Sequence, residues 1–491
     1  MNEANNINYL LNVVIDYALC KKLIDEYDSD YYLNLLLNFF NLTEIKKEET
    51  SNDISIFDAL LKLYDLKKEE YNYPDFITAV LNIFTPLPSV VNDNFQRLIE
   101  IDSKKASDYL YKISTDSLYI NTENLKKDIK WKVDSKYGKV DITINLSKPE
   151  KDPRDILKAK QMPSSNYPLC MLCKENMGYK GRPSYPSKLN LRFVKVDIDS
   201  GETYYMQYSP YSYFNQHLIV FNKKHIPMVV NKNTFSHLLN FVDEFPHYFL
   251  GSNADLPIVG GSILSHDHYQ GGDKILPMFA ATDAFKIEFS NHNDVHASYL
   301  NWPLSVIRLK SNNKESLIEL ADDILNAFIK FEDNDNEIYA FTNGERHNTI
   351  TPIAHKDGEL FVLDLALRNN YSNENYPLGL YHPHSEYWCI KKENIGLIEV
   401  LGLAILPRRL KDTLLAIEDD INNNVDISTD EKVKEHYSWI KNIDLSNKSD
   451  LDNKLKEEIG HTYVKILECC KIFKTDKQAQ ESINKIKTLM K

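Results

Sequence analysis

The hydrophobic pattern of this chain changes its period near residue 131, and that change limits the folds that the chain can adopt. Before it, apolar residues recur at three- and four-residue spacing, as in the segments 31–40 and 54–66, which predicts amphipathic helices. After it, apolar and polar residues alternate over 140–146, which predicts a half-buried β-strand. The sequence therefore indicates a helical N-terminal region joined to mixed α and β structure.

Two later stretches share a plan of strands, a helix and a histidine-rich segment. The first has expected strands at 218–221 and 256–263, a helix at 234–245, and the sequence Ser-His-Asp-His at 265–268. The second has an expected helix at 316–331, expected strands at 304–309, 337–341, 349–354 and 359–368, and His-Pro-His at 382–384. We therefore predict an α+β protein with two related halves. The expected regions are a helical N-terminal region at 1–125, a first half at 126–300, a second half at 301–440 and a helical C-terminal tail at 441–491.

Composition and charge exclude several classes of protein. Lysine and arginine number 58 against 71 aspartate and glutamate residues, so the formal net charge is −13 and we expect no general attraction to nucleic acid or anionic membranes. Hydrophobic residues make up 43% of the chain, which fits a soluble globular protein and not a disordered one. The six cysteines are too few and too unevenly spaced for a disulfide framework and favour a reducing cytoplasm.

Neither a signal peptide nor a membrane span is expected. The first residues, Met-Asn-Glu-Ala-Asn-Asn, lack a basic region. The longest strongly apolar stretch, 395–406, contains Glu399 and is well short of the ~20 residues that cross a bilayer. We therefore expect a cytoplasmic protein.

The segment 260–272 carries the strongest chemical signal in the chain. It contains four of the 15 glycines and reads Gly-Gly-Ser-Ile-Leu-Ser-His-Asp-His-Tyr-Gln-Gly-Gly. In an extended segment His266, His268 and Gln270 point to one face, while Asp267 and Tyr269 point away. A neutral imidazole can attack phosphorus, an amide N–H can bind a phosphate oxygen, and flanking glycines let a phosphate approach the backbone. Ordinary histidines at a strand end are the alternative interpretation.

Neither a Gly-x-x-x-x-Gly-Lys-Ser/Thr loop nor a Gly-x-Gly-x-x-Gly sequence after a strand occurs, so conventional ATP and dinucleotide folds are not expected. The segment instead resembles the His-x-His-x-Gln site of the histidine-triad-like nucleotidyltransferases. Its Ser-His-Asp-His-Tyr-Gln-Gly-Gly sequence is similar to the type 2 galactose-1-phosphate uridylyltransferase family. The resemblance continues in the sequences at 142–153, 170–182 and 376–410, in the right order.

This resemblance implies two histidine-triad-like halves, each an antiparallel sheet with packed helices, after a helical N-terminal extension. It also implies that His268 is the nucleophile and that Gln270 holds a non-bridging oxygen of the transferred group. The implied substrates are UDP-glucose and galactose-1-phosphate, exchanged through a uridylyl-histidine, and the implied assembly is a homodimer. Covalent catalysis of this kind predicts ping-pong kinetics.

Two cysteines have the spacing of a metal site. Cys170 and Cys173 form a Cys-x-x-Cys pair whose thiolates can reach one ion, although cysteine is also a common small buried residue. By the resemblance, a structural zinc would be held by Cys170, Cys173, His225 and His266. His217 is the reserve ligand. A second metal near His347, His382 and His384 is an alternative to satisfied histidines at a packed turn.

Four further residues are candidates for contact with the substrate. Ser262 and Ser265 compete for the place of a serine that the family has just before the motif, and Asn253 matches an asparagine that contacts the nucleotide phosphates. Gly271 is a candidate for close approach of a phosphate to the backbone. Asp267 departs from the proline between the histidines of type 1 relatives, which puts the local backbone geometry in question.

Two rival functions remain. A nucleotide-sugar or dinucleotide phosphorylase would use the same histidine with another nucleotide. A non-catalytic, zinc-stabilised nucleotide-sugar binder would need no nucleophile, so the presence of both His268 and Gln270 favours an enzyme.

Overall fold

The computed structural model describes residues 6–46, 50, 54–147, 166–183, 185–261 and 263–490. Its contacts divide the chain into two compact units. One consists of Met1–Lys126, Pro149–Val196 and Tyr205–Ser212, and the other of Lys127–Lys148, Asp197–Tyr204 and Tyr213–Lys491.

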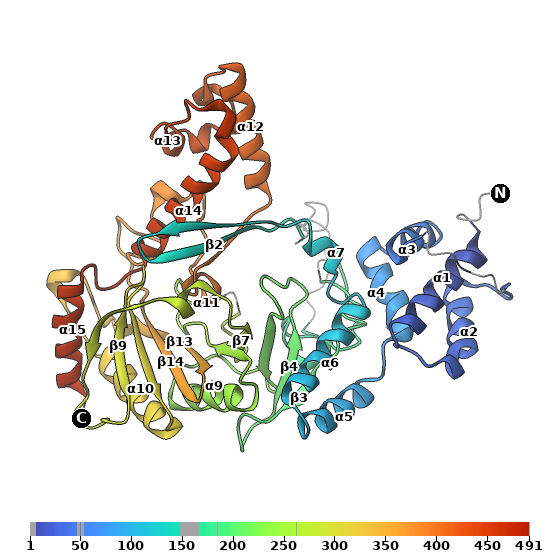
Figure 1. Cartoon of the computed structure of the whole chain (residues 1–491), viewed down its shortest axis with the longest axis horizontal. Helices are drawn as coiled ribbons and strands as arrows, with labels where there is room; N and C mark the ends of the chain where they lie inside the picture. Colours follow the sequence, from blue (N-terminus) through green and yellow to red (C-terminus); the bar gives the residue numbers. More distant parts are fainter. Residues whose placement is uncertain are drawn as a thin grey trace. The chain divides into compact units, whose positions relative to one another are not determined.

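The first unit begins with a series of amphipathic helices, which Figure 1 draws in blue. At the N-termini of several helices, a side chain accepts a hydrogen bond from a backbone N–H group that has no partner within the helix. The side chain of Ser55, for example, accepts from the N–H of Asp58, as their three-residue spacing predicts. The helices are α1 (Ile7–Cys20), α2 (Ser29–Phe40), α3 (Ile56–Tyr64), α4 (Tyr73–Phe84), α5 (Pro88–Ile99), α6 (Ser103–Asp116) and α7 (Thr122–Leu125). The helical N-terminal region predicted by the hydrophobic period is therefore present.

Two short strands follow the helices in the sequence, β3 (Val194–Val196) and β4 (Tyr204–Tyr208). Strand β3 packs on helix α5, where the side chain of Asn92 accepts from the N–H of Lys195 at 3.0 Å. Gln96 donates to the carbonyl of the same lysine at 2.8 Å. A single turn of 3-10 helix, η3 (Lys174–Asn176), comes directly after Cys173.

The second unit contains a small sheet with the order β1-β2-β15. Strands β1 (Ile129–Ser135) and β2 (Gly138–Ile144) form an antiparallel hairpin, and β15 (Leu403–Leu406) runs parallel to β2. Helix α14 (Leu451–Cys469) packs against β1, and the indole of Trp131 donates to the carbonyl of Lys456 at 3.0 Å. Apolar residues of α14 and of the hairpin belong to one core cluster.

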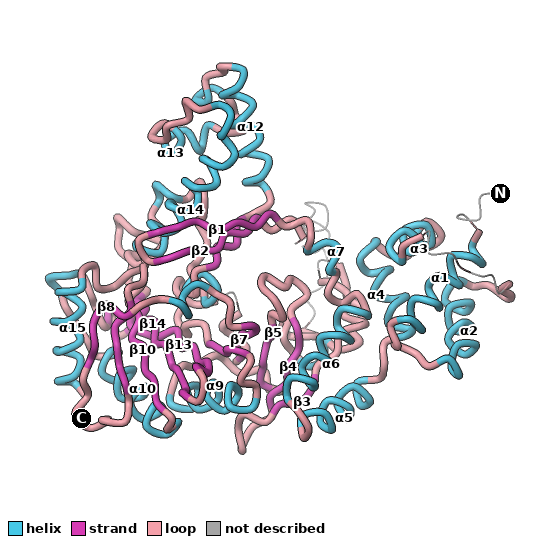
Figure 2. The backbone as a smooth tube through the Cα atoms, in the orientation of Figure 1, coloured by secondary structure: helices cyan, strands magenta, loops and turns pink. Residues whose placement is uncertain are grey.

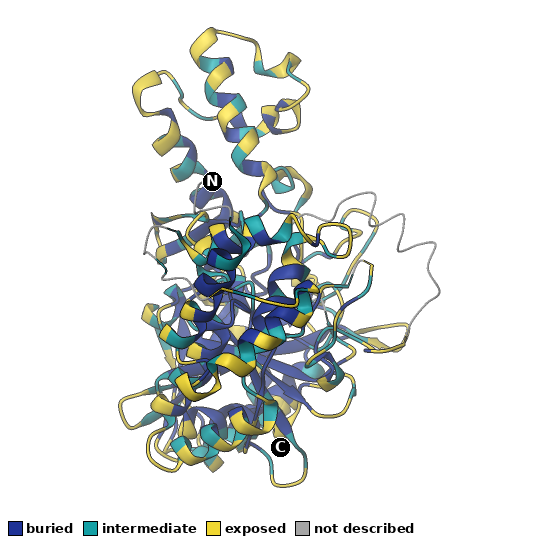
Figure 3. Cartoon of the chain, turned by 90° about the vertical axis from the view of Figure 1, so that its right-hand side faces the viewer, coloured by how far each residue is buried: buried dark blue, intermediate teal, exposed yellow. Residues whose placement is uncertain are grey.

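The main sheet of the second unit includes the strand run β5-β7-β6-β13-β14-β10-β9-β8, several strands of which are labelled in magenta in Figure 2. Each printed pairing within this run is antiparallel. The strands are β5 (Leu218–Asn222), β6 (Tyr248–Gly251), β7 (His268–Asp273), β8 (Asp283–Ile287), β9 (His296–Leu300), β10 (Val306–Ser311), β13 (Asn348–Asp357) and β14 (Leu360–Asn369). The central strands are almost wholly buried, as the dark ribbons of Figure 3 show.

Helices cover this sheet on one face. Helix α9 (Lys232–Glu244) packs on β6 and β13, and α10 (Lys314–Ile329) packs on β10 and β13. Toward the C-terminus follow α11 (Leu397–Val400), α12 (Arg409–Asn423) and α13 (Tyr437–Ile440), and the segment 441–491 contains α14 and α15 (Asp476–Leu489). The predicted α+β class, antiparallel sheet with packed helices, is confirmed. That the strands before and after α10 form two related halves stays a prediction.

Two predicted strands are wrong. In the apolar run 256–263, the described residues 256–261 and 263 form turns and irregular backbone, and the strand of that region is β6, which ends before the run begins. The segment 337–341 is also mostly irregular, since Glu337 adopts a left-handed conformation with φ 58° and only Phe341–Thr342 form the short strand β11. A short apolar run does not by itself distinguish a strand from a loop, because its length and composition fit both.

Among the described residues, no single helix is both long and apolar enough to cross a membrane. Only the pair α4 and α5, bent by 67° at a short break, reaches that length and composition when both helices are taken together.

Candidate functional site

Strand β7 carries the His-x-His-x-Gln segment and lies between two partners. Phe221 and Ile219 of β5 stand opposite His268 and Gln270 on one side, and Gly251 of β6 stands opposite Gln270 on the other. Since side chains alternate along a strand, His268 and Gln270 share one face of the sheet. The other face of β7 carries Tyr269.

The imidazole of His268 is buried and held by the backbone. Its Nδ1 atom lies 2.8 Å from the carbonyl oxygen of His266. A carbonyl oxygen only accepts, so Nδ1 carries the proton and Nε2 keeps its lone pair. Burial lowers the pKa of His268 to about 4, which keeps the ring neutral at neutral pH. The residue thus has the protonation state that a nitrogen nucleophile requires.

Gln270 is half-buried, and its amide has a partner far away in the sequence. The Nε2 atom of His217 lies 3.0 Å from Oε1 of Gln270. His217 immediately precedes strand β5, so the antiparallel pairing of β5 with β7 brings the two side chains together. The sequence had suggested His217 only as a reserve zinc ligand; it does not belong to the metal-binding group described below.

The residues of the motif that point away are held by a buried polar network. The hydroxyl of Tyr204 donates to Asp267 Oδ2 at 2.7 Å. His237 Nδ1 lies 2.9 Å from the hydroxyl of Tyr269, and His237 Nε2 lies 2.6 Å from Asp199 Oδ2. Burial raises the pKa of Asp267. Asp267, which departs from the type 1 pattern, is therefore a structural anchor of β7.

The two glycines after Gln270 are required by packing. A methyl group on Gly271 would collide with the carbonyl oxygen of Phe249 on β6. Gly272 has φ 154°, and a methyl group there would lie 2.7 Å from the ring of Phe214. Neighbouring strands and an aromatic ring thus account for this glycine pair, and a role of Gly271 in substrate binding stays a prediction.

The other predicted substrate residues have different surroundings. Asn253 is buried in the loop after β6; its Oδ1 accepts from the N–H of Leu397 at 2.9 Å, and its amide nitrogen would lie 2.7 Å from a methyl group on Gly261. Ser265 is exposed at a bend just before His266. Ser262 lies outside the described residues, as does part of the similar sequence at 142–153.

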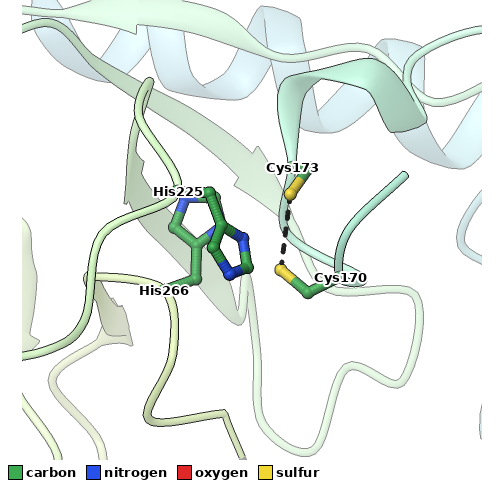
Figure 4. A group of neighbouring side chains, drawn as sticks. All are labelled: Cys170, Cys173, His225 and His266. Atoms are coloured by element: carbon green, nitrogen blue, oxygen red, sulfur yellow. Dashed lines mark hydrogen bonds between the residues drawn. The ribbon is translucent and has the colours of Figure 1, made fainter. Parts of the chain in front are cut away.

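Cys170, Cys173, His225 and His266 form a group able to hold a metal ion. One ligand atom from each residue can be chosen so that all four lie within 4.8 Å of one another. Figure 4 shows the two sulfur atoms facing the two imidazole rings. The sulfur atoms are 3.6 Å apart, so the cysteines are not joined as a disulfide. A donor set of two thiols and two imidazoles suits zinc at a structural site.

The surroundings of these side chains determine where the His266 ring carries its proton and how readily the Cys173 thiol loses one. His266 Nε2 lies 2.8 Å from the carbonyl oxygen of Asn222, so Nε2 carries the proton and Nδ1 is the atom that would coordinate an ion. Burial raises the pKa of the Cys173 thiol to about 11. A divalent cation would have to displace that proton to bind the sulfur.

The three histidines considered for a second metal do not form such a group. Within the described part of the chain, the Cys170 group alone brings three or more ligand side chains together. His347 Nδ1 pairs with Asn370, His382 Nε2 with Asn394 and His384 Nε2 with the carbonyl of Leu380. These contacts are those of histidines at packed turns.

Sequence reasoning missed the network behind the motif. Nothing in the local pattern links His237 or Asp199 to Tyr269, because they come from different elements and meet only in the folded unit. For His217, one signal was available in the sequence. It stands directly before the predicted strand 218–221, so it could have been expected near the motif if that strand pairs with the motif segment.

The chain is similar to known proteins over most of its length. Residues 24–227 match the family model of the galactose-1-phosphate uridyl transferase N-terminal domain, and residues 240–439 match that of the C-terminal domain. A galactose-1-phosphate uridylyltransferase of Clostridium acetobutylicum is 44% identical over 98% of this chain and 99% of its own. Enzymes of the same name from Clostridium perfringens and Fusobacterium nucleatum are each 42% identical; they cover 98% and 97% of this chain and the same shares of their own.

Proposed function

Since the chain belongs to the galactose-1-phosphate uridylyltransferase family, we propose that it transfers a uridylyl group from UDP-glucose to galactose-1-phosphate through His268. The chain is accordingly a nucleotidyltransferase of galactose metabolism. The observation that carries the assignment of the nucleophile is the hydrogen bond from His268 Nδ1 to the carbonyl oxygen of His266, which leaves the lone pair on Nε2.

In the first half-reaction, the lone pair of His268 Nε2 attacks the α-phosphorus of UDP-glucose. The bond between that phosphorus and the bridging oxygen breaks, and its electron pair leaves on glucose-1-phosphate. In the second, a phosphate oxygen of galactose-1-phosphate attacks the same phosphorus, and the phosphorus–nitrogen bond returns its electron pair to Nε2. No proton has to move, because both sugar phosphates are anionic leaving and attacking groups.

The backbone contact of His268 supports the second step as well as the first. While the uridylyl group is attached to Nε2, the ring keeps its Nδ1 proton and carries a positive charge. The carbonyl of His266 accepts from that proton and stabilises the charge. A positively charged imidazole is a good leaving group, so the covalent intermediate passes readily to the acceptor.

Two amides would bind the transferred phosphoryl group. Gln270 shares the face of His268 on β7 and is half-buried, so its amide nitrogen is in a position to donate to a non-bridging oxygen. Asn253 is a second candidate, because the N–H of Leu397 fixes its oxygen and leaves its amide nitrogen for another acceptor. We retain Ser262, Ser265 and Gly271 as weaker candidates.

The metal-binding group would hold a structural zinc ion. All four donors of such an ion are side chains of this chain, which leaves no coordination position for substrate. Because His266 is both a ligand and the carbonyl partner of His268, the ion would orient the nucleophile. We also infer a homodimer in the cytoplasm, which light scattering and cell fractionation would test.

The test is covalent labelling. Incubating the protein with UDP-glucose carrying ³²P at the α-position, quenching in base and digesting with protease should give an acid-labile label on the peptide with His268. Chasing with galactose-1-phosphate should remove the label as UDP-galactose. His268→Gly should abolish labelling, whereas His296→Gln, which removes an exposed histidine of β9, should label like the wild type.

Other results of the labelling experiment would contradict the proposed function or favour a rival function. A wild-type protein that takes no label would contradict the transferase assignment. Labelling by adenine nucleotides alone, or removal of the label by inorganic phosphate and not by sugar phosphates, would favour a phosphorylase. Full labelling of His268→Gly would show that another residue is the nucleophile.

A further inference from the structure

We propose that His217 is a positioning residue that fixes the side-chain amide of Gln270, so that the amide N–H groups and not the oxygen face the transferred phosphoryl group. The inference rests on the proposed function for the identity of that group. It assigns to His217 a role in transition-state stabilisation exerted entirely through Gln270.

The contact is short and held from several sides. His217 Nε2 lies 3.0 Å from Gln270 Oε1, and only 2% of His217 is exposed. The ring of Phe214 lies 4.5 Å from the imidazole between centroids, and the ring of Tyr213 stacks on it at 5.6 Å. These aromatic rings exclude water and restrict the imidazole to one orientation.

Gly272 contributes to this arrangement. The ring of Phe214 occupies the space that a side chain at Gly272 would need, two residues after Gln270 on β7. The second glycine after Gln270 therefore admits the ring that packs on His217. Strand β7 thus carries the amide of Gln270, and its Gly272 makes room for the Phe214 ring that holds the imidazole of His217.

The position of the single imidazole proton follows from the surroundings. Burial lowers the pKa of His217 to about 4, so the ring is neutral and has one N–H at neutral pH. Within the described structure, Nδ1 is buried without a hydrogen-bond partner. An N–H at Nδ1 would leave a donor unsatisfied in an apolar setting, whereas an N–H at Nε2 donates to Gln270. The proton therefore lies on Nε2.

The orientation of the amide follows in turn. An Nε2–H group donates, so it requires the oxygen of Gln270 and repels the NH₂ group. With the oxygen fixed toward His217, the NH₂ group must point away from it. A flipped amide would lose this hydrogen bond and present an oxygen to the negatively charged phosphoryl group. Fixing the donor before the reaction avoids reorganisation during it.

A pair of matched variants tests the role. His217→Leu keeps an apolar side chain but removes the donor, and should slow formation of uridylyl-enzyme from UDP-glucose in single turnovers by about 10- to 100-fold. His217→Gln keeps an N–H at nearly the reach of Nε2 and should recover most of the rate. The loss should fall on kcat and kcat/KM alike, since the interaction strengthens in the transition state.

Measurement in the Gln270→Ala background separates positioning from general structural support. There His217→Leu should lower the rate less than about twofold further, because no amide remains to be positioned. An equal loss in both backgrounds would overturn the proposal. So would a His217→Gln variant as slow as His217→Leu while both remain folded by circular dichroism.

A second measurement does not depend on transferase activity. In protein labelled with ¹⁵N-histidine, the His217 signals, assigned by their absence in His217→Leu, should show a neutral ring protonated at Nε2 at pH 7. A ring protonated at Nδ1, or at both nitrogens, would overturn the proposal. If the wild type formed no uridylyl-enzyme, the proposed function would fail, and this spectrum would still decide whether His217 donates to Gln270.

Discussion

The Nδ1 atom of His237 lies 2.9 Å from the hydroxyl oxygen of Tyr269, whose neighbours in the sequence are His268 and Gln270. Side chains alternate along β7, so this contact lies on the opposite face of the strand from the candidate nucleophile. His237 is itself held by Asp199 at 2.6 Å. One face of the strand is therefore anchored by polar contacts, while the other carries the proposed nucleophile.

Tyr269→Phe should reduce stability more than catalysis. The change removes the hydroxyl and leaves His237 Nδ1 unpaired in a buried site, which we expect to lower the free energy of unfolding by about 1–2 kcal/mol. Uridylyl transfer should stay within about threefold of the wild type at a temperature where both are folded. Urea denaturation and a transferase assay would measure the two effects. A large loss of activity at unchanged stability would contradict this assignment.

Gly271→Ala should be strongly destabilising. The new methyl group would collide with the carbonyl oxygen of Phe249, so the pairing of β6 with β7 must shift. We expect a loss of about 3 kcal/mol or more in the free energy of unfolding, at the upper end of overpacking effects. Gly201→Ala is the matched control, because a methyl group there would have only an ordinary contact with the Asp199 side chain. Equal stability of the two variants would show that β7 tolerates the change.

His355 should make stability fall as the pH is lowered. Burial lowers its pKa from 6.5 to about 4. Asp364 favours the charged ring, whereas Arg308, Lys274 and Lys310 oppose it. Above pH 6.5 the ring is neutral in both states; as the pH falls from 6.5 toward 4, only the unfolded chain takes up the proton, which favours unfolding.

The size of this effect can be isolated with His355→Leu. Between pH 7.5 and pH 5 the wild type should lose about 2 kcal/mol more unfolding free energy than the variant. Denaturation curves at several pH values give the difference directly. Parallel curves for the two proteins would mean that His355 binds its proton equally well in both states.

Replacement of one cysteine of the metal-binding group should release zinc. Cys173→Ser should lower the zinc content from one ion per chain to a small fraction and reduce the thermal midpoint, because a buried serine is a poor ligand for zinc. Cys389→Ser removes a free cysteine outside the group and should keep its metal. Metal analysis by mass spectrometry distinguishes the two. Zinc-free wild-type protein with full activity would rule out the site.

Much of the site was predictable from local sequence. Extended backbone at 266–270 places His268 and Gln270 on one face by the two-residue period alone. The Cys170 and Cys173 pair was recognisable by spacing, and resemblance to the family supplied His225 and His266 as its companions. The helical N-terminal region and the helices α9 and α10 followed from apolar periodicity within two or three residues.

Other features depended on the fold. The apolar run 256–263 was expected to be a strand, yet its described residues, 256–261 and 263, form turns and irregular backbone, and the strand of that region is β6. Apolar composition alone does not make a segment a strand, because the partner strands available in the sheet decide whether its backbone forms interstrand hydrogen bonds.

From the sequence alone it was predictable that His268 and Gln270 share one face of a strand, because strand alternation and motif spacing are local properties of the chain. The partners that hold these side chains became known from the folded chain: His217 contacts Gln270, the backbone carbonyl of His266 contacts His268, and His237 contacts Tyr269. The tautomer of each imidazole depends on whether its partner donates or accepts a hydrogen bond. The pairing of distant strands and the resulting burial fix that partner, and neither is encoded in a local pattern.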